Sequence, residues 1–378
     1  MSRPVAEASG IEDADLGKDS MKMKLFLGVI MLSASVNMAQ EKPQEKAVDV
    51  PERMNHGGFM QGGMHHVSAK GVILEQKVDA EAHTITLRVG PITLPANTNH
   101  MMMPQPPDVF WTTPWDGWLL SYTPQLVDAK GNEVPGRVLH HVAFWNENRG
   151  DFLCPNKEEH IFGSGGEMNS WPEVPGYGYP IQKGNTIRIE TMVHNPTATS
   201  YEKVYLEVAM SYQEAGKDAA APPDVKSYFP AWMDVQSCGN SEYDLKPGKN
   251  EATGTVRVKY DGVLLGVGGH MHDYAKQLVL EDVTHKDTVA TLDATLDDHG
   301  RMLGMTVATF FDRGGYPFAA GDELKITATY DNLMGTLMRD GAMGIAVGYF
   351  VPAHDAALAA LRRGKPMAHD MPGMDHDH

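Results

Sequence analysis

Short runs in which apolar and polar side chains alternate fill the central part of this chain. Apolar residues fall at every second position in 205–210, and the same is true of 324–330. A period of two is typical of β-strands with one buried face. Turn-forming sequences such as 128–132, 246–250 and 314–317 separate these runs at short intervals. Many short strands without interleaved helical patterns predict an all-β fold of antiparallel β-sandwiches.

The length of the chain sets its domain organisation. At 378 residues it exceeds one ordinary core and fits about two domains, by the prior of roughly 150 residues per domain. Residues 214–223 lack a strand pattern and separate two β-rich blocks of similar size, so we place the boundary there. The predicted parts are an N-terminal extension and signal peptide (1–39), a Met/His-rich linker (40–68), an N-terminal β-sandwich domain (69–213), a linker (214–226), a C-terminal β-sandwich domain (227–353), and a short helix with a Met/His-rich tail (354–378).

The segment that begins at Met21 has the features of a secretory signal peptide. Lys22 and Lys24 precede the apolar run 25–32, and small residues follow in 33–35. This run is much shorter than the roughly 20 residues that span a bilayer, and no later segment approaches that length. We therefore expect an exported protein, periplasmic or extracellular, with no transmembrane segment after processing. The 20 residues before Met21 are typical of a misassigned start or an added extension.

The charge and the cysteines limit the partners and the cross-links. A formal charge of −17 repels phosphate backbones and anionic lipid headgroups, which argues against nucleic acid and membrane surfaces as partners. The two cysteines are Cys154 and Cys238, on opposite sides of the predicted domain boundary. An exported location permits a disulfide between them, but two independent thiols are an equal alternative, because sequence does not determine connectivity.

Histidines and methionines with the character of copper ligands form two separated sets. They are His140, His141 and His194 in the first set, and His270, His272 and Met343 in the second. A thioether beside imidazoles suits copper, because sulfur stabilises Cu(I) whereas zinc and the hard cations seldom use methionine. The pattern predicts two copper ions, one in each domain.

Spacing supports the two sets to different degrees. On a strand, His270 and His272 would project from one face about 7 Å apart, with Met271 on the other face. Adjacent residues point to opposite faces, so His140 and His141 need a twisted edge, a bulge, or the use of unlike ring nitrogens to share an ion. Glycines just before His270 also favour a bulge or a close approach of another segment.

The remaining candidates have simpler interpretations. His194 follows the run 186–193 on its polar face, so we expect it to look outward, toward solvent or another domain. Met343, judged alone, would be assigned to the hydrophobic core. Six other histidines lack paired spacing, and we predict ordinary loop positions for them, although His100 precedes three methionines and is a candidate auxiliary copper contact. They are His83, His100, His160, His285, His299 and His354.

A family resemblance joins these segments. The sequences of 139–144, 192–195, 269–272 and the segment around Met343 resemble, in order and spacing, the copper type II, ascorbate-dependent monooxygenases, such as the peptidylglycine hydroxylating and dopamine β-monooxygenases. The resemblance spans about residues 70–352. It implies two consecutive jelly-roll β-sandwiches, with one copper bound by three histidines and the other by two histidines and Met343, facing each other across a solvent-filled cleft.

The resemblance also implies a reaction. The first copper would store and deliver an electron, and the second would bind O₂ and attack a substrate C–H bond, which makes His270, His272 and Met343 the catalytic set. The partners implied are a small organic substrate, O₂ and an electron donor such as ascorbate. Gly268 stands where the peptidylglycine enzymes have a carboxylate-binding arginine, which argues against an amidating activity on peptides.

Two other functions fit parts of the sequence. A non-catalytic copper-binding protein, for buffering or resistance outside the cytoplasm, would use the same sites together with the Met/His clusters in 54–66 and 367–378. The segments 269–272 and 341–344 also resemble the stress-upregulated nodulin-type proteins, which widens the range of functions. A β-sandwich module that binds carbohydrate or protein would leave all six ligands incidental.

Overall fold

The computed structural model describes residues 69–216, 225–238 and 241–354. Within these ranges the chain forms 23 strands and three short 3₁₀ helices, and no α-helix. Every strand pair in them is antiparallel except β8–β11, so the prediction of an all-β, antiparallel fold is confirmed. The predicted signal peptide, the Met/His-rich linker and tail, and the helix expected at 355–361 lie outside the described residues.

The first half of the described chain forms two sheets around one core. One sheet has the order β1-β2-β10-β4-β8-β11, with β5 also paired to β10, and the other has the order β3-β9-β6-β7. Alternate residues of β10, such as Leu206 and Val208, bury their side chains against both sheets, as their period of two predicts. The strands are β1 Ile73–Asp79, β2 Thr84–Leu94, β3 Val109–Thr112, β4 Gly117–Leu119, β5 Thr123–Val127, β6 Leu139–Gly150, β7 Glu158–Ser164, β8 Tyr177–Ile181, β9 Thr186–Val193, β10 Tyr201–Glu214 and β11 Lys226–Ser227, with η1 His100–Met102 and η2 Gly136–Val138.

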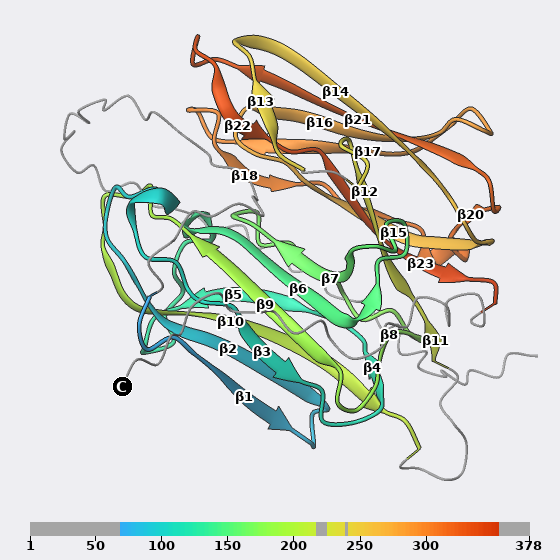
Figure 1. The fold of residues 1–378 in the computed structure, drawn as a ribbon, viewed down its shortest axis with the longest axis horizontal. Coiled ribbons are helices and arrows are strands. Elements are labelled where there is room, and N and C mark those ends of the chain that lie inside the picture. The colour runs from blue at the N-terminus through green and yellow to red at the C-terminus, as the bar shows by residue number, and fades with distance from the viewer. Residues whose placement is uncertain (1–68, 217–224, 239–240, 355–378) are drawn as a thin grey trace, which may run out of the picture. The chain divides into compact units, whose positions relative to one another are not determined.

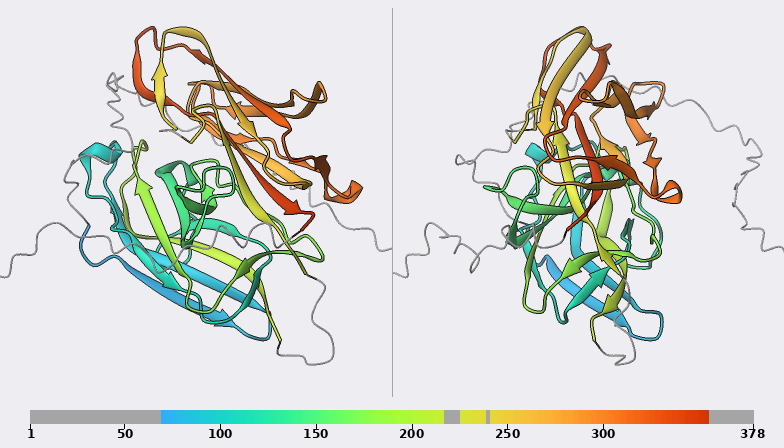
Figure 2. Two further views of the ribbon diagram at one scale, coloured as in Figure 1. Left: turned by 45° about the vertical axis from the view of Figure 1, so that its right-hand side comes forward. Right: turned by 90° about the vertical axis from the view of Figure 1, so that its right-hand side faces the viewer.

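The second half builds a separate core. The sheets are β12-β23-β15-β19, with β20 also paired to β15, then β14-β21-β16-β17-β18, and the pair β13-β22. Figures 1 and 2 show these strands, yellow to red, grouped apart from the blue and green strands of the first half. The strands are β12 Phe229–Asp234, β13 Tyr243–Leu245, β14 Gly248–Arg257, β15 Gly262–His270, β16 Ala275–Asp282, β17 Asp287–Leu296, β18 Met302–Met305, β19 Ala308–Thr309, β20 Tyr316–Phe318, β21 Glu323–Asn332, β22 Met338–Ala342 and β23 Ile345–Pro352, with η3 Phe311–Arg313.

The two cores are tied together. Phe152 and Leu153, from the connection between β6 and β7, pack in the second core, and Cys154 beside them forms a disulfide with Cys238. The structure thus selects the disulfide over two free thiols. All described residues fall within one compact unit, so the domain boundaries stay a prediction.

Two irregularities in the strands position the candidate ligands. The pairing of β6 with β9 shifts register between Leu139 and His141, so the structure has the bulge that was one of the alternatives for the adjacent histidines. The pairing of β15 with β23 shifts between Leu264 and Val267. A Cβ on Gly266 would lie 3.0 Å from the carbonyl oxygen of Ala308, so the glycine there permits the close approach that the sequence indicated.

Candidate metal centre

The three histidines of the first set come together at the ends of β6 and β9. The ring centroids of His140 and His141 lie 4.2 Å apart, and those of His140 and His194 lie 5.1 Å apart. His194 follows the last residue of β9, and its Nε2 lies 2.7 Å from the carbonyl oxygen of Arg137. When this Nε2–H donates to the carbonyl, Nδ1 keeps its lone pair and is the atom that can bind a metal.

The second set is held around a buried phenol. β15 ends at His270, so His272 lies just beyond the strand rather than on it, with its ring 5.5 Å from that of His270. The hydroxyl of Tyr330 accepts hydrogen bonds from the backbone N–H of His272 at 3.0 Å and of Met343 at 3.1 Å, and donates to the carbonyl of Met343. This phenol therefore keeps the backbones of His272 and Met343 close together.

Met343 lies in the short connection between two strands rather than in a strand. It lies between β22 and β23 and is 5% exposed, which is also what a core residue would show. It lines one cavity together with His141 and His270, so its side chain belongs to the surroundings of the cluster. Met271 is 1% exposed in the second core but also lines the small cavity beside His270 and His272, so its predicted orientation away from them stays a prediction.

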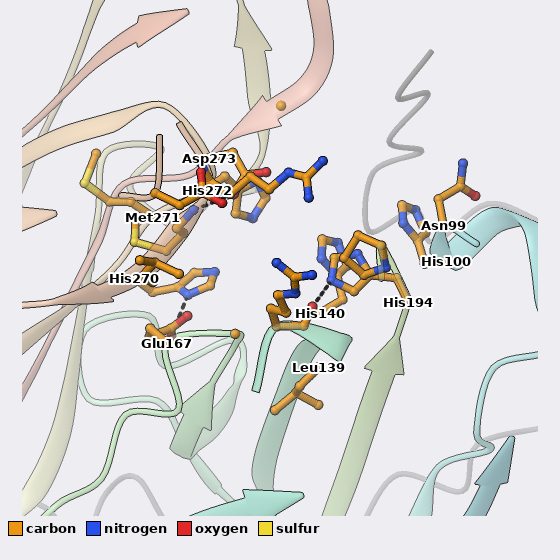
Figure 3. Close-up of a pocket in the computed structure, with 18 of the residues that line it drawn as sticks. Asn99, His100, Leu139, His140, Glu167, His194, His270, Met271, His272 and Asp273 are labelled. Carbon is orange, nitrogen blue, oxygen red and sulfur yellow. Dashed lines mark hydrogen bonds and ion pairs between the residues drawn. The ribbon is translucent and has the colours of Figure 1, made fainter. Parts of the chain in front are cut away.

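The two sets meet. Nε2 of His141 lies 3.2 Å from Nε2 of His270 and 3.4 Å from Nε2 of His272. A small cavity of about 100 Å³ lies between the other histidines of the two sets. His140 and His194 line it on one side and His270 and His272 on the other, as Figure 3 shows. The resemblance implies two separate ligand sets across a cleft, whereas here His141 contacts the second set directly.

The donor set fits a metal ion. Two nitrogens that bind one tetrahedral ion at about 2.0–2.1 Å lie roughly 3.3 Å apart. Both measured nitrogen separations are close to that value, and ligand atoms of His141, His270 and His272 all lie within 4.8 Å of one another. Nδ1 of His141 is buried without a hydrogen-bond partner, so little besides the cluster fixes this ring. The chemistry of the donors, imidazoles with a thioether nearby, suits copper.

Burial keeps part of the cluster ready to bind a cation. Burial, together with the neighbouring histidines, holds the pKa values of His140 and His141 well below the ordinary value of imidazole. A neutral ring retains the lone pair that a metal needs. Burial also lowers the pKa of His270, but the adjacent carboxylate of Glu167 outweighs this effect and the pKa is raised.

Glu167 is a site residue that the sequence did not reveal. Its Oε1 lies 2.9 Å from Nδ1 of His270 and accepts the backbone N–H of Gly165, also at 2.9 Å. The amide of Asn169 donates to the same oxygen and to the carbonyl of Gly269. This carboxylate holds Nδ1–H of His270, so that Nε2 faces His141. An acidic residue in a glycine-rich loop carries no signal of this role.

Two histidines correct the prediction of ordinary loop positions. His100, in η1, is 3% exposed and stacks on His140 with centroids 4.9 Å apart and planes 8° apart. His160 is half-buried in β7 and lies between the rings of Trp145 and Trp232. Both lie where long-range packing placed them, which spacing along the chain could not indicate. The remaining four are exposed, as predicted: His83, His285, His299 and His354.

Comparison with known proteins gives distant relatives. No protein-family profile matches the chain. "Probable copper-dependent oxygenase clz3" of Cochliobolus lunatus is 26% identical over 244 residues, which are 57% of this chain and 72% of that protein. "Probable copper-dependent oxygenase M1" of a Phoma species is 27% identical over 245 residues, 57% of this chain and 58% of that protein. These similarities support copper and an oxygenase-like function.

A solved structure of the "STIV MCP" covers 77% of this chain and 99% of its own, with 8% identity and a TM-score of 0.35, which is too low a likeness to carry an argument. Among the described residues, no helix has the length and apolar character needed to cross a membrane.

Proposed function

We propose that this chain is an exported copper-dependent monooxygenase that hydroxylates a C–H bond of a small organic substrate. The reaction takes one O₂, two electrons from an external reductant such as ascorbate, and two protons, and gives the alcohol and water. The observation that carries the proposal is the convergence of His141, His270 and His272 to nitrogen separations that suit one metal ion, with Met343 lining the adjoining cavity.

Each residue of the cluster has a role in this proposal. Copper bound here would supply the one-electron chemistry that activation of O₂ requires. The histidines would hold the metal through unprotonated ring nitrogens, Met343 would contribute a soft donor, and Glu167 orients His270 through its Nδ1–H. Tyr330 fixes the backbones that carry His272 and Met343. The three histidines of the cluster are partly buried, which limits the access of bulk water to the reactive site and so limits side reactions.

Metal analysis tests this proposal. Purified protein loaded with Cu(II) and washed is assayed for bound copper, for its electron paramagnetic resonance spectrum, and for ascorbate-dependent O₂ uptake. We expect two copper ions per chain and O₂ uptake that His272→Ala abolishes. His83→Ala, an exposed histidine away from the cluster, is the matched control and should change neither measurement.

The alternatives give different results. Two copper ions without reductant-dependent O₂ uptake would favour a buffering or resistance protein. If His272→Ala leaves the copper content unchanged, the histidine cluster is not the copper site. If the protein binds no stoichiometric copper, a β-sandwich module that binds carbohydrate or protein is the remaining function.

A further inference from the structure

A second, larger cavity of about 570 Å³ adjoins the candidate metal centre. Its floor is one face of the sheet β12-β23-β15. Val347 pairs with Trp232 on one side and Gly268 on the other, so these three residues form a row across the sheet. Ile345 and His270 belong to the next row on the same face. The floor therefore runs from an indole to a candidate metal ligand.

The facing wall comes from β6 and β7. His141, Ala143 and Trp145 alternate along β6 and all line the cavity. His160 of β7 pairs with Trp145 and stacks on it at 4.1 Å, and on Trp232 of the floor at 3.5 Å. Wall and floor are thus joined by stacked rings along one side and by the contact between His141 and His270 at one end.

The lining defines the chemistry of the ligand. Aromatic rings supply much of the surface: Tyr122, Trp145, His160, Trp171, Trp232 and Tyr349. Flat rings on the walls favour a flat ligand that stacks against them. A cavity of this volume lies within the range of roughly 300–1,000 Å³ that small-molecule sites occupy.

The charged side chains that line the cavity offer few partners to a charged ligand. Three carboxylates and one lysine, Lys157, line the cavity. Asp151 accepts the backbone N–H groups of Leu153 and Cys154, and Glu158 pairs with Arg188 at 2.8 Å. The carboxylates are therefore already bonded, and they repel an anion. The charge of Lys157 acts on two of these carboxylates, Asp151 and Asp234.

The third carboxylate in the lining is that of Asp234, and Gly268 has no side chain to contribute. Asp234 accepts the backbone N–H of Gln236 at 2.7 Å. A Cβ on Gly268 would have only a methyl of Val307 nearby, at 3.8 Å, so this part of the floor carries no side chain. Gly268 therefore supplies no partner for a charged ligand, and the carboxylate of Asp234 is already hydrogen-bonded.

We propose that this cavity is the substrate site and that it takes an uncharged, planar aromatic molecule, with the reacting carbon at the end where His141 meets His270. The reaction part of this inference rests on the proposed function. The binding part does not, because the cavity and its rings are present without a metal. The two can therefore fail separately.

Calorimetric titration of matched probes tests the ligand class. Naphthol, naphthoate and naphthylmethylamine share one ring system and differ in charge at neutral pH. We expect naphthol to bind one per chain, to metal-free and copper-loaded protein alike, and about tenfold more tightly than either charged probe. Equal or tighter binding of the anion or the amine would overturn the proposal, and so would the absence of naphthol binding.

Filling the cavity tests its location. Gly268→Leu adds a side chain where nothing but Val307 lies within 4 Å, so it should fold and weaken naphthol by at least about tenfold. Gly304→Leu adds the same side chain at another open strand glycine outside the cavity and should leave binding unchanged. Val307→Trp, at an exposed position beside Gly268, is the second variant and should act like Gly268→Leu. Unchanged binding in a folded Gly268→Leu or Val307→Trp protein would place the ligand elsewhere.

Copper content and O₂ uptake, measured on the same samples, separate this proposal from the proposed function. If the protein binds naphthol but binds no copper, the proposed ligand site is supported and the proposed oxygenase reaction is refuted. If it binds copper and consumes O₂ but does not bind naphthol, the proposed reaction is supported and this substrate class is refuted.

Discussion

Replacing Glu167 with Gln tests whether a carboxylate outside the ligand set controls the metal site. The substitution keeps the shape and the acceptor oxygen but removes the charge that faces Nδ1 of His270 at 2.9 Å. Both side chains are shielded from solvent, at 2% and 13% exposed, so the interaction is weakly screened.

The expected magnitudes follow from the type of bond. A hydrogen bond to a charged group contributes about 1.5–3 kcal/mol and a neutral one about 0.5–1.5 kcal/mol, so the metal-free Glu167→Gln protein should lose about 1 kcal/mol of unfolding free energy. Carboxylates that orient metal-bound histidines change metal affinity by about 10–100-fold. We therefore expect copper affinity to fall within that range, a larger effect than the loss in stability alone.

Competition titration against a chelator of known affinity measures copper binding, and urea unfolding measures stability. The matched control is Glu159→Gln, which removes an equally buried carboxylate that pairs with Arg149 at 2.9 Å, away from the metal ligands. This control should lose stability but keep its copper affinity. If Glu167→Gln binds copper as tightly as the unchanged protein, or if Glu159→Gln weakens copper equally, then Glu167 does not position His270.

Three further outcomes are expected. Replacing Cys154 and Cys238 with Ser opens a cross-link across a sequence separation of 84 residues and should cost about 4.5 kcal/mol in unfolding free energy by chain entropy, measured by urea unfolding under non-reducing conditions. The Met343→Ile protein should fold, because the two side chains have similar volumes, and its affinity for Cu(I) should fall by about tenfold. Unchanged Cu(I) affinity would show that Met343 is a core residue rather than a ligand. Hydrogen bonding to Asp282 raises the pKa of His285, so its stabilising contribution is present below the ordinary histidine pKa and is lost as pH rises through the raised value; Asp282→Asn should lower the pKa seen by NMR titration.

The fold class could be predicted because alternation is a local property. Leu206 and Val208 repeat with the pleat of a strand, and their burial needs only that the sheet has one apolar face. The bulge at Leu139–His141 could be predicted only in part, because a twisted edge and unlike ring nitrogens were alternatives to it. Which sheets pack together depends on contacts distant in sequence, which no local pattern carries.

The family resemblance predicts His194 and Met343 as partners of the paired histidines. In the structure the rings of His194 and His140 lie 5.1 Å apart between centroids, and Met343 lines a cavity with His141 and His270, whereas metal binding by these residues stays a prediction. The sequence gives no sign of Glu167, because no spacing pattern links a carboxylate to the Nδ1 of a histidine 103 residues away. The sequence predicts an ordinary loop position for His100, with an auxiliary copper contact as the alternative, because its stacking on His140 arises only from tertiary packing.

The contact between the two sets limits how the ligands can be shared. One imidazole nitrogen has one lone pair, so Nε2 of His141 serves one ion at a time. The resemblance assigns His141 to the first ion, whereas the separations of 3.2 and 3.4 Å place its Nε2 with His270 and His272. In that arrangement His140 and His194 remain for the first ion, and the buried ring of His100, stacked on His140, is a further imidazole beside them. The number of histidines around the cluster is therefore enough for two ions even when His141 belongs to the second.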